Sequence, residues 1–232
     1  MNGDAGRPAG AAPLIERLRS ACAADWQAYT RHRFVRTLAA GTLPEACFRR
    51  YLVQDYLFLF HFARAYGLAA FKADALADVR AAASGLAAIV EREMGLHVAY
   101  CAGWGLSEAE MAATAEADAT IAYTRYVLEK GLSGDLLDLQ VALAPCIIGY
   151  ADIGRELAAD PATQWQGNPY RAWIETYAGA DYQDVADDHA RQLDALAARR
   201  GGDARFPSLS ETFRQATRLE AAFWEMGLTA GG

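Results

Sequence analysis

Apolar residues recur at intervals of three and four along most of the chain, and the alternating patterns typical of strands are scarce. This spacing predicts an all-α protein. The expected helices cover residues 12–40 (with a bend), 45–73, 75–103, 108–131, 134–159, 168–177, 179–200 and 209–228.

Short segments rich in Gly and Pro separate the expected helices, at 41–44, 131–135, 160–169 and 201–207. Two helix starts carry the sequence signature of a capping box. In one, Ser107 precedes Glu110; in the other, Ser208 precedes Glu211 and follows Pro207.

The chain contains no internal repeat, no low-complexity linker and no shift in composition that would mark a second domain. We therefore expect residues 13–232 to form a single-domain helical bundle. Residues 1–12 are rich in Gly, Ala and Pro and lack the apolar core of a signal peptide, so they are predicted to be a flexible tail.

Composition narrows the possible functions. Hydrophobic residues make up 53% of the chain, and the net charge of −7 with no basic cluster argues against a nucleic-acid surface. The four cysteines form no C-x-x-C pair, which favours free thiols in a reducing cytoplasm. No uninterrupted apolar stretch of membrane-spanning length is present, so no membrane segment is expected.

Two acids occupy positions where apolar residues belong. Asp55 lies on the apolar stripe of the helix expected at 45–73, and Glu220 lies on that of the last helix. Each could be a structural ion-pair partner, for example of an Arg on another helix. Alternatively, burial would raise the pKa of Glu220, which suits an acid that delivers a proton near neutral pH.

Cys146 lies on the inner face of the helix expected at 134–159, in the stretch LAPCIIGYADIG. A buried free cysteine is usually a small hydrophobic residue. Two features favour a nucleophile here: Pro145 bends the helix just before the thiol, and Tyr150 brings a phenol to the same face one turn later. An ordinary thiol is mostly protonated at neutral pH, so a nucleophile at this position would need help from its surroundings.

Over about residues 15–228 the chain resembles the TenA family, also called thiaminase II. The matching segments are YLVQDYLFLFHFARAYG, EREMGLH, AYTRYVLEKGLSGD, LAPCIIGYADIG, NPYRAWIETYAG and LEAAFWEM. The resemblance implies the heme-oxygenase-like helical fold and a homotetramer. It also implies an enzyme of thiamine salvage that hydrolyses 4-amino-5-aminomethyl-2-methylpyrimidine to the hydroxymethylpyrimidine, and thiamine more poorly.

The resemblance also assigns roles to residues. Cys146 matches the nucleophile that adds to the pyrimidine ring, and Glu220 matches the acid/base that protonates a ring nitrogen. Asp55 matches the carboxylate that holds the ring's amino edge. Aromatic residues around the ring and the thiol are matched by Tyr123, Tyr150 and Tyr177. This is covalent catalysis without a cofactor or metal.

One position departs from the family pattern. The family commonly has Tyr three residues after the Asp, where this chain has Phe58. Phe keeps the aromatic wall of the predicted substrate site and loses a hydroxyl, so the difference bears on substrate preference.

Two alternatives belong to other functional classes. One is a di-iron oxidase or oxygenase of the same fold, in which Glu91, Glu93 and His97 would contribute ligands; the sequence lacks the further partners at helical spacing, so we interpret His97 as a packing histidine. The other is a non-catalytic regulator of the thiamine pathway, and the acidic balance opposes direct DNA binding by such a protein.

Overall fold

The structure, a computed structural model, describes residues 12–229, and its regular elements are all helical, which confirms the predicted all-α fold. The elements are α1 (Leu14–Ala21), α2 (Ala23–Thr30), α3 (Arg33–Ala39), α4 (Glu45–Lys72), α5 (Leu76–Ala88), the π-helical segment η1 (Ile89–Glu93), α6 (Met94–Ala102), α7 (Glu108–Ala112), α8 (Asp118–Ser133), α9 (Leu136–Ala159), α10 (Arg171–Ala178), α11 (Ala180–Arg199) and α12 (Phe206–Leu228). All but residue 12 of the predicted tail lies outside the described residues.

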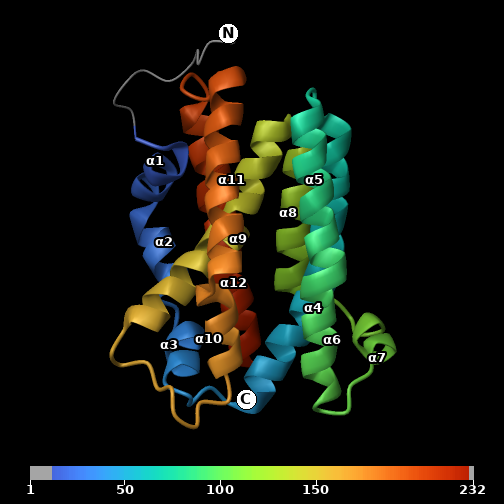
Figure 1. Ribbon diagram of the computed structural model, residues 1–232, viewed down its shortest axis with the longest axis vertical. Coiled ribbons are helices and arrows are strands. Elements are labelled where there is room, and N and C mark those ends of the chain that lie inside the picture. The colour runs from blue at the N-terminus through green and yellow to red at the C-terminus, as the bar shows by residue number, and fades with distance from the viewer. Residues whose placement is uncertain (1–11, 230–232) are drawn as a thin grey trace.

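Helix α9 is the central element of the bundle. It packs against α8, α10, α11 and α12, and most of its side chains are buried because apolar residues face every direction around it. On the other side of the bundle, α4 packs against α5, α6 and α8 (Figure 1).

The apolar character of α9 bears on the expectation that the chain has no membrane segment. This helix is long and apolar enough to cross a membrane by length and composition. However, 89% of its most apolar window is buried inside the bundle, so its hydrophobicity is explained by its place in the protein core.

The region predicted as one helix over 108–131 forms two, α7 and α8, because the short turn after α7 redirects the chain. The capping box at Ser107 is confirmed: the Ser107 hydroxyl accepts from the Glu110 backbone N–H, and the Glu110 carboxylate accepts from the Ser107 N–H. The prediction of a box at Ser208 is wrong. Helix α12 already begins at Phe206 and Ser208 bonds the carbonyl of Arg205 instead.

The helix predicted over 75–103 is interrupted by a segment that the sequence pattern did not reveal. Between α5 and α6, η1 winds as a π-helix. Such bulges insert an extra residue into a helical turn, and they occur frequently at functional sites because they re-aim side chains. Here the bulge ends at Glu93, one turn before His97.

Close approach of backbones sets the position of α10. A Cβ at Gly154 of α9 would lie 2.4 Å from the carbonyl carbon of Tyr177, so only glycine permits this contact. The contact fixes Tyr177 against the C-terminal half of α9, which also contains Tyr150.

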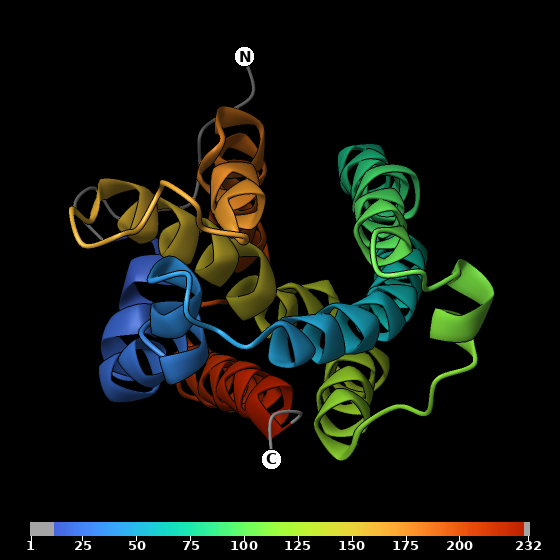
Figure 2. The same cartoon turned by 90° about the horizontal axis from the view of Figure 1, so that it is seen from below.

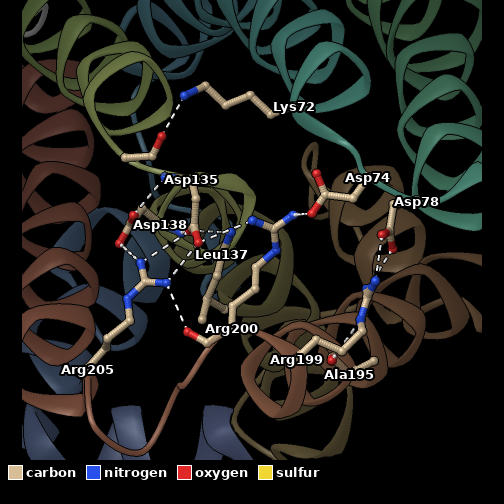
Figure 3. A network of polar contacts seen from close by, with 11 residues as sticks. Lys72, Asp74, Asp78, Asp135, Leu137, Asp138, Ala195, Arg199, Arg200 and Arg205 are labelled. Atoms are coloured by element: carbon tan, nitrogen blue, oxygen red, sulfur yellow. Dashed lines mark hydrogen bonds and ion pairs between the residues drawn. The ribbon is translucent and has the colours of Figure 1, made fainter.

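Charged residues gather at the end of the bundle where α8 passes into α9. Asp135 caps α9 by accepting from the backbone N–H groups of Leu137 and Asp138. Arg205 pairs with both Asp135 and Asp138, and Arg200 joins Asp135 to Asp74 (Figure 3). These residues form the end network, a set of carboxylates each matched by a guanidinium.

Candidate active site

Cys146 and Glu220, predicted from different parts of the sequence, lie together in the bundle. Cys146 comes from α9 and Glu220 from α12, and their side chains are in hydrogen-bonding contact. The hydroxyl of Tyr123, from α8, donates to Glu220 Oε1 at 2.9 Å. Glu220 is almost fully buried, whereas Cys146 keeps part of its surface accessible.

Burial controls the protonation of this pair. It raises the pKa of Glu220 to about 8, an increase that the hydrogen bond from Tyr123 opposes and the charge of Asp55 supports. Burial also raises the pKa of the Cys146 thiol well above its usual range, and the nearby carboxylates of Glu220 and Asp55 add to that increase. Near neutral pH the thiol is therefore protonated and a proton is available on Glu220.

The contact between the thiol and the carboxyl group also allows a proton to move from one to the other. When sulfur attacks an electrophile, Glu220 can give its proton to a basic atom of the same ligand and take up the proton that leaves the sulfur. The pair thus combines a nucleophile with a proton carrier.

Asp55 of α4 lies at the centre of a second polar contact. Its Oδ2 is 2.7 Å from His97 Nε2 and accepts from the Tyr51 hydroxyl at 3.2 Å. The Tyr51 oxygen in turn accepts from Trp173 Nε1 at 3.3 Å. Asp55 is thus partnered by a histidine of α6, where the sequence suggested an arginine.

The partners of His97 fix its protons. Its Nδ1 lies 2.8 Å from the backbone carbonyl of Glu93, which can only accept, so Nδ1 must donate. The contact from Nε2 to Asp55 therefore requires a second proton, held by the imidazole or the carboxyl group. Burial lowers the pKa of His97, but the hydrogen bond and charge of Asp55 outweigh it and the net shift is upward.

Aromatic rings enclose the two polar groups. The Phe58 ring lies 4.9 Å from Tyr123 and also contacts Phe62 and Phe223. In a second group of rings, Tyr150 lies 4.9 Å from Tyr177 and 5.3 Å from Trp224. All of these distances join ring centroids. Flat apolar walls beside a few polar groups are typical of sites for aromatic ligands.

A cavity of about 620 Å³ adjoins this cluster. It lies between η1 and α6 on one side and α10 and α11 on the other, two parts of the bundle that stand apart in Figure 2. Glu93, His97, Trp173, Tyr177 and Tyr182 are among its lining residues. His97 connects cavity and cluster, since its ring lines the former and bonds Asp55 in the latter.

The structure thus gathers the seven residues singled out from the sequence, although only Tyr177 among them lines the cavity itself. Sequence reasoning missed the contact between His97 and Asp55, and it missed Glu93 and Tyr182 as cavity residues. The signal for Glu93 and His97 was their spacing of four within EREMGLH, which places both on one helical face. The π-helical turn that aims them had no such signal.

The described part of the chain contains no group of side chains that could bind a metal ion. No three His, Cys, Asp or Glu side chains within it are grouped so that they could hold an ion. His97 bonds Asp55 and a backbone carbonyl, and Glu91 is exposed. This arrangement gives no support to the di-iron alternative.

Comparisons with known proteins agree with the resemblance noted in the sequence. The model of the TENA/THI-4/PQQC family matches residues 19–230. An uncharacterized protein of Haemophilus influenzae is 42% identical over 93% of this chain and 99% of its own. The aminopyrimidine aminohydrolase of Halalkalibacterium halodurans is 35% identical over 87% of this chain and 89% of its own.

The fold is also similar to that of a solved structure. A protein from Silicibacter sp. TM1040, described as a TenA family transcription regulator, superposes with a TM-score of 0.88 at 45% identity. The match covers 93% of this chain and 96% of that one.

Proposed function

The chain belongs to the TENA/THI-4/PQQC family, and we propose that it is an aminopyrimidine aminohydrolase of thiamine salvage. Its substrate is 4-amino-5-aminomethyl-2-methylpyrimidine, which it converts to the hydroxymethylpyrimidine; thiamine is a poorer substrate. The observation that carries this proposal is the contact between the Cys146 thiol and the buried carboxyl group of Glu220.

In the proposed reaction, the sulfur of Cys146 bonds to a ring carbon and its proton passes through Glu220 to a ring nitrogen. Addition removes the aromaticity of the ring. The leaving nitrogen then departs from the exocyclic methylene with the electron pair of the broken C–N bond. Water bonds to that methylene and releases a proton. Expulsion of the sulfur restores the ring, and the proton on the ring nitrogen returns through Glu220 to the thiol.

The remaining groups hold the ring. Asp55 accepts from the 4-amino group, and the proton that it shares with His97 keeps the carboxylate at the substrate edge. Tyr123 fixes the orientation of Glu220 through its hydrogen bond. The rings of Phe58, Tyr150 and Tyr177 pack on the pyrimidine faces.

The test is a panel of thiamine-related pyrimidines incubated with the purified protein, with release of the hydroxymethyl product measured by chromatography. We expect turnover without added metal or nucleotide, fastest with the aminomethyl compound. A panel that stays unreacted until iron is added would overturn the proposal in favour of the di-iron class. Binding of the pyrimidines without turnover in either condition would overturn it in favour of a regulator.

The same proposal extends to assembly and location. We expect a homotetramer in the cytoplasm, acting on a small-molecule substrate. Large exposed apolar residues support burial between subunits, with Phe71 85% and Leu132 68% exposed in the single chain. The four cysteines are free thiols, as a reducing compartment favours. Light scattering on the purified protein would give the subunit number directly.

A further inference from the structure

The cavity that His97 and Tyr177 join to the candidate active site has a volume of about 620 Å³, more than a single pyrimidine ring occupies, and its lining differs from that of the ring site. Among the described residues that line it are three acids, Glu93, Glu175 and Asp181, and no Lys or Arg. Five aromatic side chains line it as well: Phe48, Tyr100, Trp173, Tyr177 and Tyr182. Acids together with aromatic faces are the groups that bind organic cations.

Glu93 differs from the other two acids. Glu175 is half exposed and pairs with Arg171 at 2.7 Å, and Asp181 is exposed. Glu93 is the last residue of the π-helical turn and lines the cavity, and no described side chain donates a hydrogen bond to its carboxylate. Burial raises its pKa to about 7, with His97 opposing and Asp55 supporting the increase. Glu93 is half-buried, and the partial loss of water around its carboxylate costs free energy that a bound cation would recover.

The position of Glu93 relates it to the ring site. Its backbone carbonyl accepts from His97, whose opposite nitrogen contacts Asp55. In the function proposed above, the amino edge of the pyrimidine binds at Asp55, and the methylene is next to that amino group on the ring. Because His97 contacts Asp55 and also lines the cavity, the group on the methylene can extend past His97 into the cavity. Tyr177 borders both spaces, through its ring contacts with Tyr150 and Tyr182.

We propose that this cavity is the subsite for the leaving group, that it selects leaving groups bearing a positively charged nitrogen, and that Glu93 is the residue that sets this selectivity. The proposal rests on the function proposed above. Two kinds of leaving group share this chemistry: a primary ammonium and the quaternary nitrogen of a thiazolium ring. In either case the C–N bond breaks with its electron pair going to nitrogen, so the group departs neutral.

This charge balance determines which kinetic constant changes. The carboxylate attracts the cation in the ground state, and the attraction fades as the nitrogen becomes neutral. Glu93 therefore contributes to substrate capture and not to the chemical step. Its loss should appear in KM for cationic leaving groups, with kcat unchanged or slightly higher.

The experiment compares Glu93→Gln with wild type on three substrates with the same pyrimidine. The leaving groups are a primary amine, its neutral N-acetyl amide, and the thiazolium of thiamine. We expect KM for the amine to rise by about 10- to 100-fold in Glu93→Gln, the effect of losing one charged hydrogen-bond partner. KM for the amide should change by less than about threefold. A matching rise for thiamine extends the subsite to quaternary nitrogen, and its absence restricts the subsite to ammonium.

The control variant is Glu175→Gln, the same substitution in an acid that lines the cavity but is exposed and paired. It should leave the charge selectivity unchanged. An equal loss on the amine and the amide in Glu93→Gln, with a melting temperature like that of wild type, would overturn the inference. So would an equal effect of Glu175→Gln, because the selectivity would then come from the general field. If wild type hydrolyses none of the three substrates, the function itself fails.

Discussion

Two regions of this protein contain carboxylates whose hydrogen-bonding partners differ in kind. In the end network, Asp135 and Asp138 face Arg205, and Asp74 and Asp135 face Arg200 (Figure 3). In the candidate active site, Glu220 faces a thiol and a phenol, and Asp55 faces an imidazole and a phenol. The partners in the first region carry permanent charge, whereas those in the second region can exchange protons.

The difference is visible in the protonation of two acids. Burial raises the pKa of Asp135, but hydrogen bonds from Arg205 and from the Asp138 backbone outweigh it and hold the pKa at about 2. Burial is the largest influence on Glu220 too, and there no guanidinium opposes it, so its pKa is about 8. A guanidinium beside a carboxylate fixes a charge that holds the fold together, and its absence leaves a group that can store a proton.

The largest expected effect of a substitution concerns the thiol. Cys146→Ser should reduce turnover of the aminomethylpyrimidine to background, because a hydroxyl is a far poorer nucleophile than a thiol. The two side chains are close in volume, so the melting temperature should stay nearly unchanged. Product release and thermal unfolding measured on the same preparation test this. The control is Cys22→Ser, where the buried thiol donates to the Leu18 carbonyl and a hydroxyl can do the same. Full activity of Cys146→Ser would remove this residue from the mechanism.

Glu220→Gln should lower kcat by about 100- to 10,000-fold, since the amide cannot carry a proton from sulfur to the ring. The same substitution should raise the stability of the folded protein at alkaline pH. The folded-state pKa of Glu220, about 8, exceeds the ordinary value of 4.5. As pH rises from 4.5 to 8, only the unfolded chain can ionise, so this group makes wild type progressively less stable.

The Gln variant loses that pH dependence, so it should melt above wild type at pH 8–9 and near it at pH 5. Thermal unfolding at the two pH values measures this. The control is Glu225→Gln, an exposed acid of the same helix. A variant that melts below wild type at pH 9 would show that Glu220 is stabilising, like the carboxylates of the end network.

Asp55→Asn should weaken substrate affinity and rate together by about 10- to 100-fold, because an amide offers no charged acceptor to the 4-amino group. The amide oxygen can still accept from His97, so the helices should remain in place. Titration calorimetry with the hydroxymethyl product separates affinity from rate. An unstable variant whose folded fraction binds normally would place Asp55 with the structural acids.

The converse test removes a guanidinium from the end network. Arg205→Met should reduce the free energy of unfolding by about 1 kcal/mol at pH 7, since its partners are partly exposed and solvent screens the pairs. Activity should not change. The depressed pKa of Asp135 means that this stabilisation is present above its ordinary pKa of 3.8 and disappears as pH falls towards 2.

Urea unfolding at pH 7 and at pH 3 measures this, and the difference between variant and wild type should shrink at the lower pH. Arg17→Met is the matched control, because its partner Asp203 is 69% exposed and should contribute little. Loss of activity in a stable Arg205→Met would show that the two regions are coupled.

The same contrast explains what the sequence could and could not predict. Helical periodicity located most helices, and acids on apolar stripes identified Asp55 and Glu220, because both signals are local. Most of the specific roles came from the family resemblance. The contact between His97 and Asp55 spans 42 positions and depends on a π-helical turn that apolar spacing does not encode. The partners of Asp135 were missed for the same reason, since Arg200 and Arg205 lie 65 and 70 positions away.

The smallest expected effect concerns Phe58, whose side chain is 3% exposed and contacts Tyr123, the phenol that orients Glu220. In Phe58→Tyr a new hydroxyl at the site edge would bond substrate or the attacking water. One neutral hydrogen bond contributes on the order of 1 kcal/mol, so discrimination between aminopyrimidines should change by a few-fold to about tenfold.

The Phe58 ring also contacts Phe62 and Phe223, so the substitution could instead place the hydroxyl among apolar rings and lower the stability. If the new hydroxyl points towards those rings, it has no acceptor there, and stability falls by about 1–3 kcal/mol. Melting temperature measured beside rates on the aminomethyl compound and thiamine separates the two cases, with Phe62→Tyr, one turn further along α4, as the control. A changed substrate ratio at unchanged stability places Phe58 on the substrate wall. Lower stability at an unchanged ratio would place it in the protein core, and the aromatic wall would then consist of the tyrosines alone.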